Sequence, residues 1–196
     1  LNAINLVDGI DGLSASLTLF FLLNAAYLFY SANNPYYFLT IAFSSSILVF
    51  IFYNLSNKRK IFLGDTGSLG LGILVSVISL GMLNTNQDFS SLTPINPSLF
   101  LVLILTYPLL DVLRVFILRL YNKKSPFDAD RNHIHHKIID LGFSHFQAVM
   151  IILSTQTLLL LLNIWSVFST SLFLIIINIT SMLQIKSTSG GKISAW

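Results

Sequence analysis

The sequence predicts an all-α, polytopic membrane protein. Of its 196 residues, 54% are hydrophobic and only 10% are charged, and the mean hydropathy is +0.77. A soluble domain normally carries about 25% charged residues. The apolar residues form solid runs of Leu, Ile and Phe, unlike the alternating pattern of a membrane β-barrel. Since backbone groups in lipid must be hydrogen-bonded within their own segment, we expect each run to be a helix.

Six apolar segments are predicted to cross the membrane, against the roughly 17–25 residues that a spanning helix needs. They cover residues 13–30, 36–53, 69–83, 98–121, 146–163 and 171–185. The third is short. We expect all six to belong to one transmembrane domain over residues 1–196. The polar start of the chain resembles the middle of a protein, so we also expect the chain to be the C-terminal part of a larger one.

The positive charges lie on one side of this predicted topology. Six crossings place the loops 54–68 and 122–145 and the C-terminal tail on the same side as the N-terminus. That side contains Lys58, Arg59, Lys60, Lys123, Lys124, Arg131, Lys137, Lys186 and Lys192. The loops of the other side contain no Lys or Arg, so the basic side is predicted to be cytoplasmic. These membrane flanks account for the net charge of +3, and we expect no nucleic-acid partner.

The groups able to do acid–base or metal chemistry share that side. The chain has no Cys, which excludes disulfides and cysteine zinc sites, and no Glu, so its carboxylates come from eight aspartates. The cytoplasmic segments contain Asp8, Asp11, Asp65, Asp128, Asp130, Asp140 and all four histidines. We therefore expect a site formed by cytoplasmic loops.

The first motif is NAINLVDGIDGL at residues 2–13. Asn5, Asp8 and Asp11 are spaced by three, so they share a face if the segment is helical. The two glycines of the motif permit an irregular turn equally well. Two carboxylates and an amide could bind a base or ribose, or support a metal. Alternatively, Asp8 and Asp11 cap the helix expected to start near residue 13.

The second motif is FLGDTGSLG at residues 62–70. We expect the next helix to start at about Leu69, with Thr66 or Ser68 as its cap and free N–H groups that attract phosphate. Asp65 offers the hard oxygen ligand that Mg²⁺ prefers. The alternative is a turn with a capping acid.

The third motif is the cluster of His133, His135 and His136 beside Arg131, within residues 125–137. His133 and His136 could share a helical face and bind zinc with a carboxylate. The flanking Arg131 and a lysine repel a dication and attract anions, which favours an anion site.

Three further polar residues are set apart from the motifs. His145 is predicted to be a surface residue. Asp111 and Arg114 lie at i,i+3 in the fourth apolar segment, where an unpaired charge costs several kcal/mol. We expect a mutual ion pair, the alternative being that Asp111 faces the site.

Together the three motifs resemble the polyprenyl-phosphate N-acetylhexosamine-1-phosphate transferase family, glycosyltransferase family 4. The matching stretches are residues 2–13, 53–72 and 108–144. The H-x-H-H form after D-R is similar to the WecA/TagO-type branch, whereas MraY-type enzymes carry three consecutive histidines. The resemblance implies transfer of GlcNAc-1-phosphate from UDP-GlcNAc to polyprenyl phosphate, with release of UMP, at the cytoplasmic face of the bacterial inner membrane.

The resemblance also implies the site residues. Asp65 would be the ligand of Mg²⁺, with Mn²⁺ as a substitute, and Asp8, Asp11 and Asp65 would be the catalytic residues. The substrate-binding residues would be Asn5, Asn54, Arg131, His133, His135 and His136. Besides its two substrates and the bilayer, the expected partner is a second copy. Family members carry an Asp-Asp pair on earlier helices, so we expect this chain alone to lack part of the site and to be inactive.

Three alternatives stay open from the sequence. One is an MraY-type donor, the muramyl-pentapeptide. The second is half of a transporter with Asp111 on an ion path, although no internal repeat is evident. The third is a non-catalytic membrane scaffold.

Overall fold

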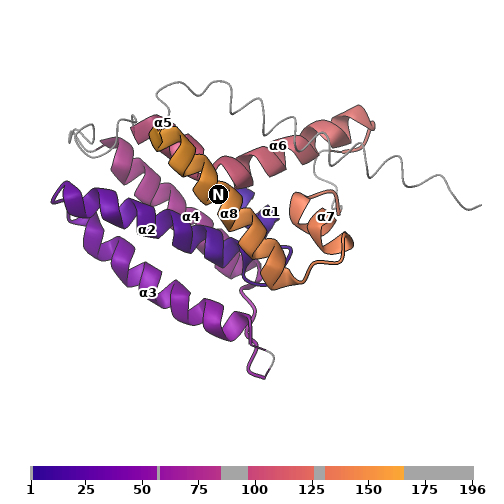
Figure 1. Ribbon diagram of the computed structural model, residues 1–196, viewed down its shortest axis with the longest axis horizontal. Helices are drawn as coiled ribbons and strands as arrows, with labels where there is room; N and C mark the ends of the chain where they lie inside the picture. Colours follow the sequence, from indigo (N-terminus) through magenta and orange to yellow (C-terminus); the bar gives the residue numbers. More distant parts are fainter. Residues whose placement is uncertain (1, 57, 85–96, 126–130, 166–196) are drawn as a thin grey trace, which may run out of the picture. The chain divides into compact units, whose positions relative to one another are not determined.

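The computed structural model describes residues 2–56, 58–84, 97–125 and 131–165, and these residues contain helices and no strands. The helices are α1 (Asn2–Val7), α2 (Leu13–Ser31), α3 (Tyr36–Asn54), α4 (Gly64–Asn84), α5 (Pro97–Ile104), α6 (Thr106–Tyr121), α7 (Ile134–Asp140) and α8 (His145–Trp165) (Figure 1). The all-α class is thus confirmed. Contacts divide the chain into the units Leu1–Leu160 and Leu161–Trp196. Most of the second lies outside the described residues, so the single domain over 1–196 stays a prediction.

Four helices, α2, α3, α4 and α8, are long and apolar enough to span a membrane. The bent pair of α5 and α6 counts as a fifth if it forms one span. These helices confirm a polytopic membrane protein for the part of the chain that is described. The predicted segment 171–185 lies outside that part.

The single straight helix predicted for residues 98–121 is wrong. The segment breaks at Leu105, and the axes of α5 and α6 differ by 64°. The physical reason is Pro108, which has no N–H to donate to the carbonyl of Ile104 and whose ring clashes with that carbonyl. Pro108 therefore encodes the bend, which lies three residues before it at Leu105.

The predicted start of the third segment at residue 69 is also wrong, because α4 begins at Gly64. Gly64 has φ +66°, a left-handed conformation that glycine adopts without strain. Ser68 lies inside the helix and donates its Oγ hydrogen to the carbonyls of Gly64 and Asp65, so neither Thr66 nor Ser68 is the cap. The 21 residues of α4 reach about 32 Å, enough to span. Asp65 consequently stands in the first turn of a spanning helix.

The main core lies around α2, which is mostly buried and runs beside α3 (Figure 1). Phe21, Phe29 and Ile78 are fully buried in this core, which joins α2 to α3, α4 and α5. By contrast, most of α3 is exposed, including Phe38 and Phe52. Large exposed apolar side chains on long helices are what contact with lipid requires.

A second core cluster positions the first and third motifs. Val7 and Leu13, which flank the two aspartates of the first motif, are fully buried against Tyr107 of α6 and Ile152 of α8. Three isoleucines of α7, Ile134, Ile138 and Ile139, pack against this cluster. The apolar residues that flank each motif therefore bring the first motif, α7 and the start of α8 together.

Candidate functional site

A polar pocket of about 330 Å³ lies where α2 and α4 begin and α3 ends. Its wall includes Asp8 and Asp11 from the turn after α1, Asn54 from the end of α3, Asp65 from α4 and His145 from the start of α8. Four of these five residues were predicted to be functional. The structure therefore brings the first two motifs together around one cavity.

Asp8 stands in the turn that follows α1, and its Oδ1 accepts a 2.5 Å hydrogen bond from Ser14 Oγ. Burial raises the pKa of Asp8 above its ordinary value; the Ser14 hydrogen bond offsets part of this rise, and the charges of Asp65 and Asp11 add to it. The carboxylates of Asp8 and Asp65 thus repel each other across the pocket. A cation between them would relieve that repulsion.

Asp11 is the meeting point of three elements. Its Oδ2 accepts hydrogen bonds from Lys60 Nζ at 2.6 Å and from His145 Nδ1 at 2.7 Å. Burial alone would raise its pKa, but the hydrogen bonds and charges of Lys60 and His145 hold the pKa of Asp11 below its ordinary value. Asp11 is thereby kept ionised at neutral pH.

Two predictions for this region are corrected. The N-cap of α2 is Gly12, and no side chain caps it, so Asp8 and Asp11 are not capping residues. His145 is partly exposed, as predicted, yet it is not set apart from the site, because it lines the pocket and pairs with Asp11. Nothing in the sequence links positions 11 and 145; only the packing of α8 against the second core cluster does.

The two predicted asparagines have different places. Asn5 donates from Nδ2 to Ser68 Oγ at 2.8 Å, which fastens α1 to α4, and it does not line the pocket. Asn54 donates from Nδ2 to the carbonyl of Ile61 at 2.7 Å. Its Oδ1 is buried and has no hydrogen-bond partner among the described residues. The amide oxygen of Asn54 is therefore an acceptor still to be satisfied at the pocket wall.

The donor set of the pocket suits a hard cation. The donor atoms offered by Asp8, Asp65 and Asn54 are all oxygens: two carboxylates and one amide Oδ1. Mg²⁺ typically binds one or two carboxylates together with water and substrate phosphates. Within the described residues, no three His or Asp side chains form a metal-binding group by themselves. The zinc site expected from His133, His136 and a carboxylate is likewise not found among the described residues.

The histidine segment is fastened to α6. His133 Nδ1 lies 2.8 Å from Asp111 Oδ2, and the backbone N–H of Ile134 donates to Asp111 Oδ1 at 2.9 Å. Arg114 Nη2 donates to Asp111 Oδ1 at 3.2 Å and also to the carbonyl of Asn132. The predicted Asp111–Arg114 ion pair is confirmed. Its partner segment, residues 132–134, was not foreseen.

His135 and His136 lie against Gly9, a residue of the pocket wall. His135 Nδ1 is 3.4 Å from the hydroxyl of Tyr107, and its Nε2 is buried without a partner among the described residues. Burial, with the neighbouring charge of His136, lowers the pKa of His135 to about 3, so this ring is neutral at pH 7. Burial and Arg131 lower the pKa of His136 too. His135 therefore offers no positive charge to an anion at neutral pH.

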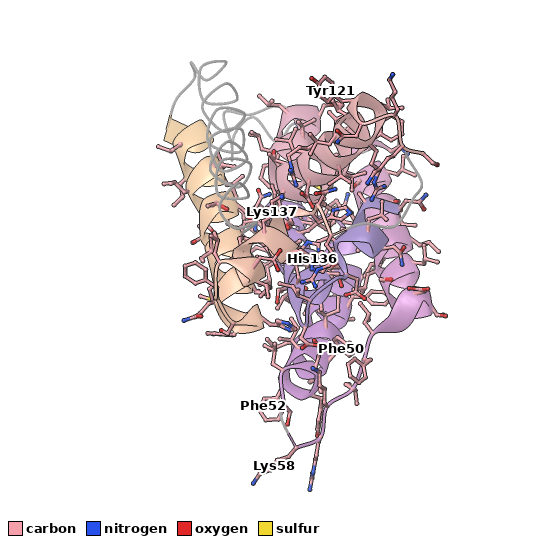
Figure 2. All side chains as sticks on the ribbon, turned by 90° about the vertical axis from the view of Figure 1, so that its right-hand side faces the viewer. Phe50, Phe52, Lys58, Tyr121, His136 and Lys137 are labelled. Atoms are coloured by element: carbon pink, nitrogen blue, oxygen red, sulfur yellow. The ribbon has the colours of Figure 1, made fainter. Side chains whose placement is uncertain are left out.

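None of the three histidines lines the polar pocket itself. Figure 2 shows His136 among the packed helices, whereas Lys58 projects at the tip of the loop between α3 and α4. Arg131 is exposed and donates to Asp140 at 3.2 Å, away from the pocket. Asp128 and Asp130 lie outside the described residues. The described part of the third motif thus adjoins the pocket at Gly9, where His135 and His136 lie.

The model of glycosyl transferase family 4 matches residues 1–83, which contain the first two motifs and the polar pocket except His145. Curated relatives extend the match to 153–173 residues. Residues 1–83 of the chain belong to glycosyl transferase family 4. No solved structure matches the chain.

Three of these family 4 relatives come from distant bacteria. A probable undecaprenyl-phosphate N-acetylglucosaminyl 1-phosphate transferase of Bacillus subtilis is 39% identical over 77% of this chain and 40% of its own length. The decaprenyl-phosphate N-acetylglucosaminephosphotransferase of Mycobacterium leprae is 31% identical over 77% and 41%. The undecaprenyl-phosphate alpha-N-acetylglucosaminyl 1-phosphate transferase of Escherichia coli K12 is 34% identical over 86% and 46%. The chain spans less than half the length of each.

Proposed function

We propose that this chain is part of an enzyme that transfers GlcNAc-1-phosphate from UDP-GlcNAc to a polyprenyl phosphate and releases UMP. The observation that carries the proposal is the pairing of Asp8 and Asp65 across a polar pocket at the ends of spanning helices. The names of the relatives supply the substrate class, since all three name a polyprenyl phosphate and the transfer of an N-acetylglucosamine phosphate group. The match of residues 1–83 to a family of glycosyl transferases does not favour the alternative that this chain is half of a transporter.

In the proposed reaction, an oxygen of the polyprenyl phosphate attacks the phosphorus next to the sugar, and the bond from that phosphorus to UMP breaks. The second pKa of a phosphate monoester is about 6, so the nucleophile is ionised at neutral pH without a dedicated base. The work of the protein is then positioning and charge neutralisation.

Asp8, Asp65 and the Asn54 amide oxygen are the residues that would hold Mg²⁺, with Mn²⁺ as a substitute. When bound, the metal would supply positive charge to the pyrophosphate oxygens. Lys60, at the edge of the pocket and partly exposed, adds a cation that attracts an anionic donor. Asp11, kept ionised by Lys60 and His145, offers an acceptor to donor hydroxyl or N–H groups.

We further propose that the enzyme lies in the plasma membrane of a bacterium with this pocket on the cytoplasmic side. The support is the basic loop at Lys58–Lys60, which borders the pocket, and the positive-inside rule. A homodimer stays a prediction, as nothing among the described residues bears on it.

The test uses the full-length enzyme in detergent with UDP-GlcNAc, polyprenyl phosphate and a titration of Mg²⁺ or Mn²⁺. Asp65→Asn should abolish metal-dependent release of UMP. Asp140→Asn is the charge-matched control, because Asp140 is exposed and lies away from the pocket, and it should retain activity. Wild-type release of UMP by Asp65→Asn would disprove the assignment. Parallel assays with the UDP-muramyl-pentapeptide test the alternative donor, which we expect to be inert.

A further inference from the structure

We propose that Asp111 and Arg114 are positioning residues, which dock the segment of residues 132–136 against the turn that carries Asp8 and Asp11. This inference rests on the proposed function for its catalytic consequence and on the geometry of α6 and α7 for the docking itself.

The place of Asp111 follows from the break in the fourth apolar segment. Pro108 turns α6 away from α5, and Asp111 stands one turn beyond that proline, with no exposed surface. A buried carboxylate without partners would be strongly destabilising. Asp111 instead has a partner on each oxygen, and two of its partners, His133 and Ile134, belong to the histidine segment.

Asp111 supplies the cap that α7 lacks in its own sequence. His133 occupies the N-cap position in an extended conformation and makes no side-chain cap hydrogen bond. The first N–H of the helix, at Ile134, is satisfied by Asp111 of α6. A helix of 7 residues is far too short to be stable in isolation. The position of α7 therefore depends on this cap and on its three packed isoleucines.

Arg114 makes a second contact with the histidine segment, and we call Asp111 and Arg114 together the clamp. Its guanidinium donates to Asp111 and to the carbonyl of Asn132, the residue before His133. One planar side chain thus compensates the buried carboxylate and fixes the backbone that leads into α7. Both bonds come from the same nitrogen, Nη2, so Arg114→Lys keeps the charge and removes the planar guanidinium that holds this nitrogen in place.

The clamp reaches the pocket through Gly9. A Cβ on Gly9 would lie 2.3 Å from His135 Nε2 and 3.0 Å from His136 Nε2, so the two rings rest directly on the backbone of the turn. That turn carries Asp8 and Asp11, whose side chains line the pocket. Release of α7 would therefore leave the turn without the surface that supports it.

The experiment compares full-length wild type with Asp111→Ala, Asp111→Asn and Arg114→Lys. Two readouts are taken: backbone hydrogen exchange of residues 132–140 in lipid nanodiscs, and separate KM and kcat values for UDP-GlcNAc. Asn122→Ala is the control, since its Nδ2 donates to the Leu118 carbonyl of the same helix α6.

Asp111→Ala should speed exchange in residues 132–140 and lower kcat/KM for the donor by about 10–100-fold, as loss of a group that orients a site residue typically does. The KM for polyprenyl phosphate should stay within about twofold. Asp111→Asn keeps an acceptor for the Ile134 N–H and should restore part of both losses. Arg114→Lys should fall between wild type and Asp111→Ala.

Unchanged exchange and unchanged donor kinetics in a folded Asp111→Ala would overturn the proposal. If that variant does not fold, Asp111→Asn and Arg114→Lys decide the question by the same two readouts. Equal losses for both substrates, with no change in exchange, would also contradict it. Exchange reports docking even if the wild type releases no UMP, so failure of the proposed function and failure of the docking are distinguishable.

Discussion

Gly9 and His135 can be neighbours only because Gly9 has no side chain. A Cβ at Gly9 would lie 2.3 Å from His135 Nε2, closer than real Cβ contacts allow. The histidine segment therefore packs against the turn bearing Asp8 and Asp11 at a position where no side chain fits.

Gly9→Ala should separate α7 from this turn and lower activity. We expect at least about a tenfold fall in kcat/KM for the donor, comparable with other losses of groups that orient a site. Gly70→Ala is the matched control, because a Cβ at Gly70 meets nothing within 4 Å. In a helix interior that change should add about 0.5–1 kcal/mol of stability. Wild-type activity in Gly9→Ala would show that the close packing of His135 is dispensable.

The docking of α7 should weaken in acid. His135 has a pKa of about 3 in the folded protein and about 6.5 when unfolded, so between these values only the undocked ring binds a proton. The stability is complete above about pH 6.5 and is lost as the pH falls toward 3. The groups that act on this ring are Tyr107, Asp111 and Arg114 of α6, with His133 and His136 beside it.

Hydrogen exchange of residues 134–140, corrected for intrinsic rates, measures this effect. Exchange should be faster at pH 5 than at pH 7 in the wild type. His135→Phe, which cannot be protonated, should lose most of the dependence. A wild type whose corrected exchange is the same at both pH values would contradict the neutral, buried state of His135.

The substitutions Asp8→Asn and Asp11→Asn should have opposite effects on stability. Burial raises the pKa of Asp8, so its ionised form is disfavoured in the fold, and a neutral amide should leave the unfolding temperature unchanged or higher. Lys60 and His145 hold the pKa of Asp11 below its ordinary value, so Asp11→Asn should lower the unfolding temperature. Thermal unfolding in detergent without metal tests both signs. Both variants should lose activity, by about 10–100-fold or more.

Acid should reduce the contrast between these two aspartates. As the pH falls toward the raised pKa of Asp8, protonation of this carboxylate removes the free-energy cost of its buried charge. The contribution of Asp11 is lost as the pH falls through its lowered pKa. A drop in unfolding temperature for Asp8→Asn at pH 7 that matches the drop for Asp11→Asn would refute this account.

Lys60→Ala should raise the KM for the donor by up to about fivefold, since a partly exposed pair contributes at most about 1 kcal/mol. Lys58→Ala removes the same charge from the tip of the same loop (Figure 2), at a residue that does not line the pocket. The control should change the KM less than Lys60→Ala does. Identical effects of the two substitutions would indicate that the positive charge of the loop as a whole attracts the donor, rather than the contact of Lys60 with Asp11.

The sequence predicted what depends on neighbouring residues. Runs of apolar residues predicted α2, α3 and α8 within a few residues of their bounds. The aspartates on one side of the predicted topology indicated which helix ends lie together at the pocket. The bend at Leu105 was also encoded locally, in Pro108, although the apolar run hid it. The start of α4 was placed too late, because a left-handed Gly64 lets the chain enter the helix without a conventional cap.

Contacts across long stretches of chain could not be predicted in this way. The pairing of His145 with Asp11 and of His133 with Asp111 depends on how α6, α7 and α8 pack around the second core cluster. Burial also changed the chemistry expected from composition. A histidine cluster suggests positive charge, but His135 is neutral because it is enclosed.

The separation between Asp11 and His145 has a consequence for biosynthesis. The two residues lie 134 positions apart. At about 5–20 residues per second, roughly 7–27 s pass after Asp11 is made before the ribosome adds His145. Once Asp65 has been added, the nascent chain carries the carboxylates of the pocket without His145 of its wall. The pocket is therefore assembled only as α8 is synthesised and inserted.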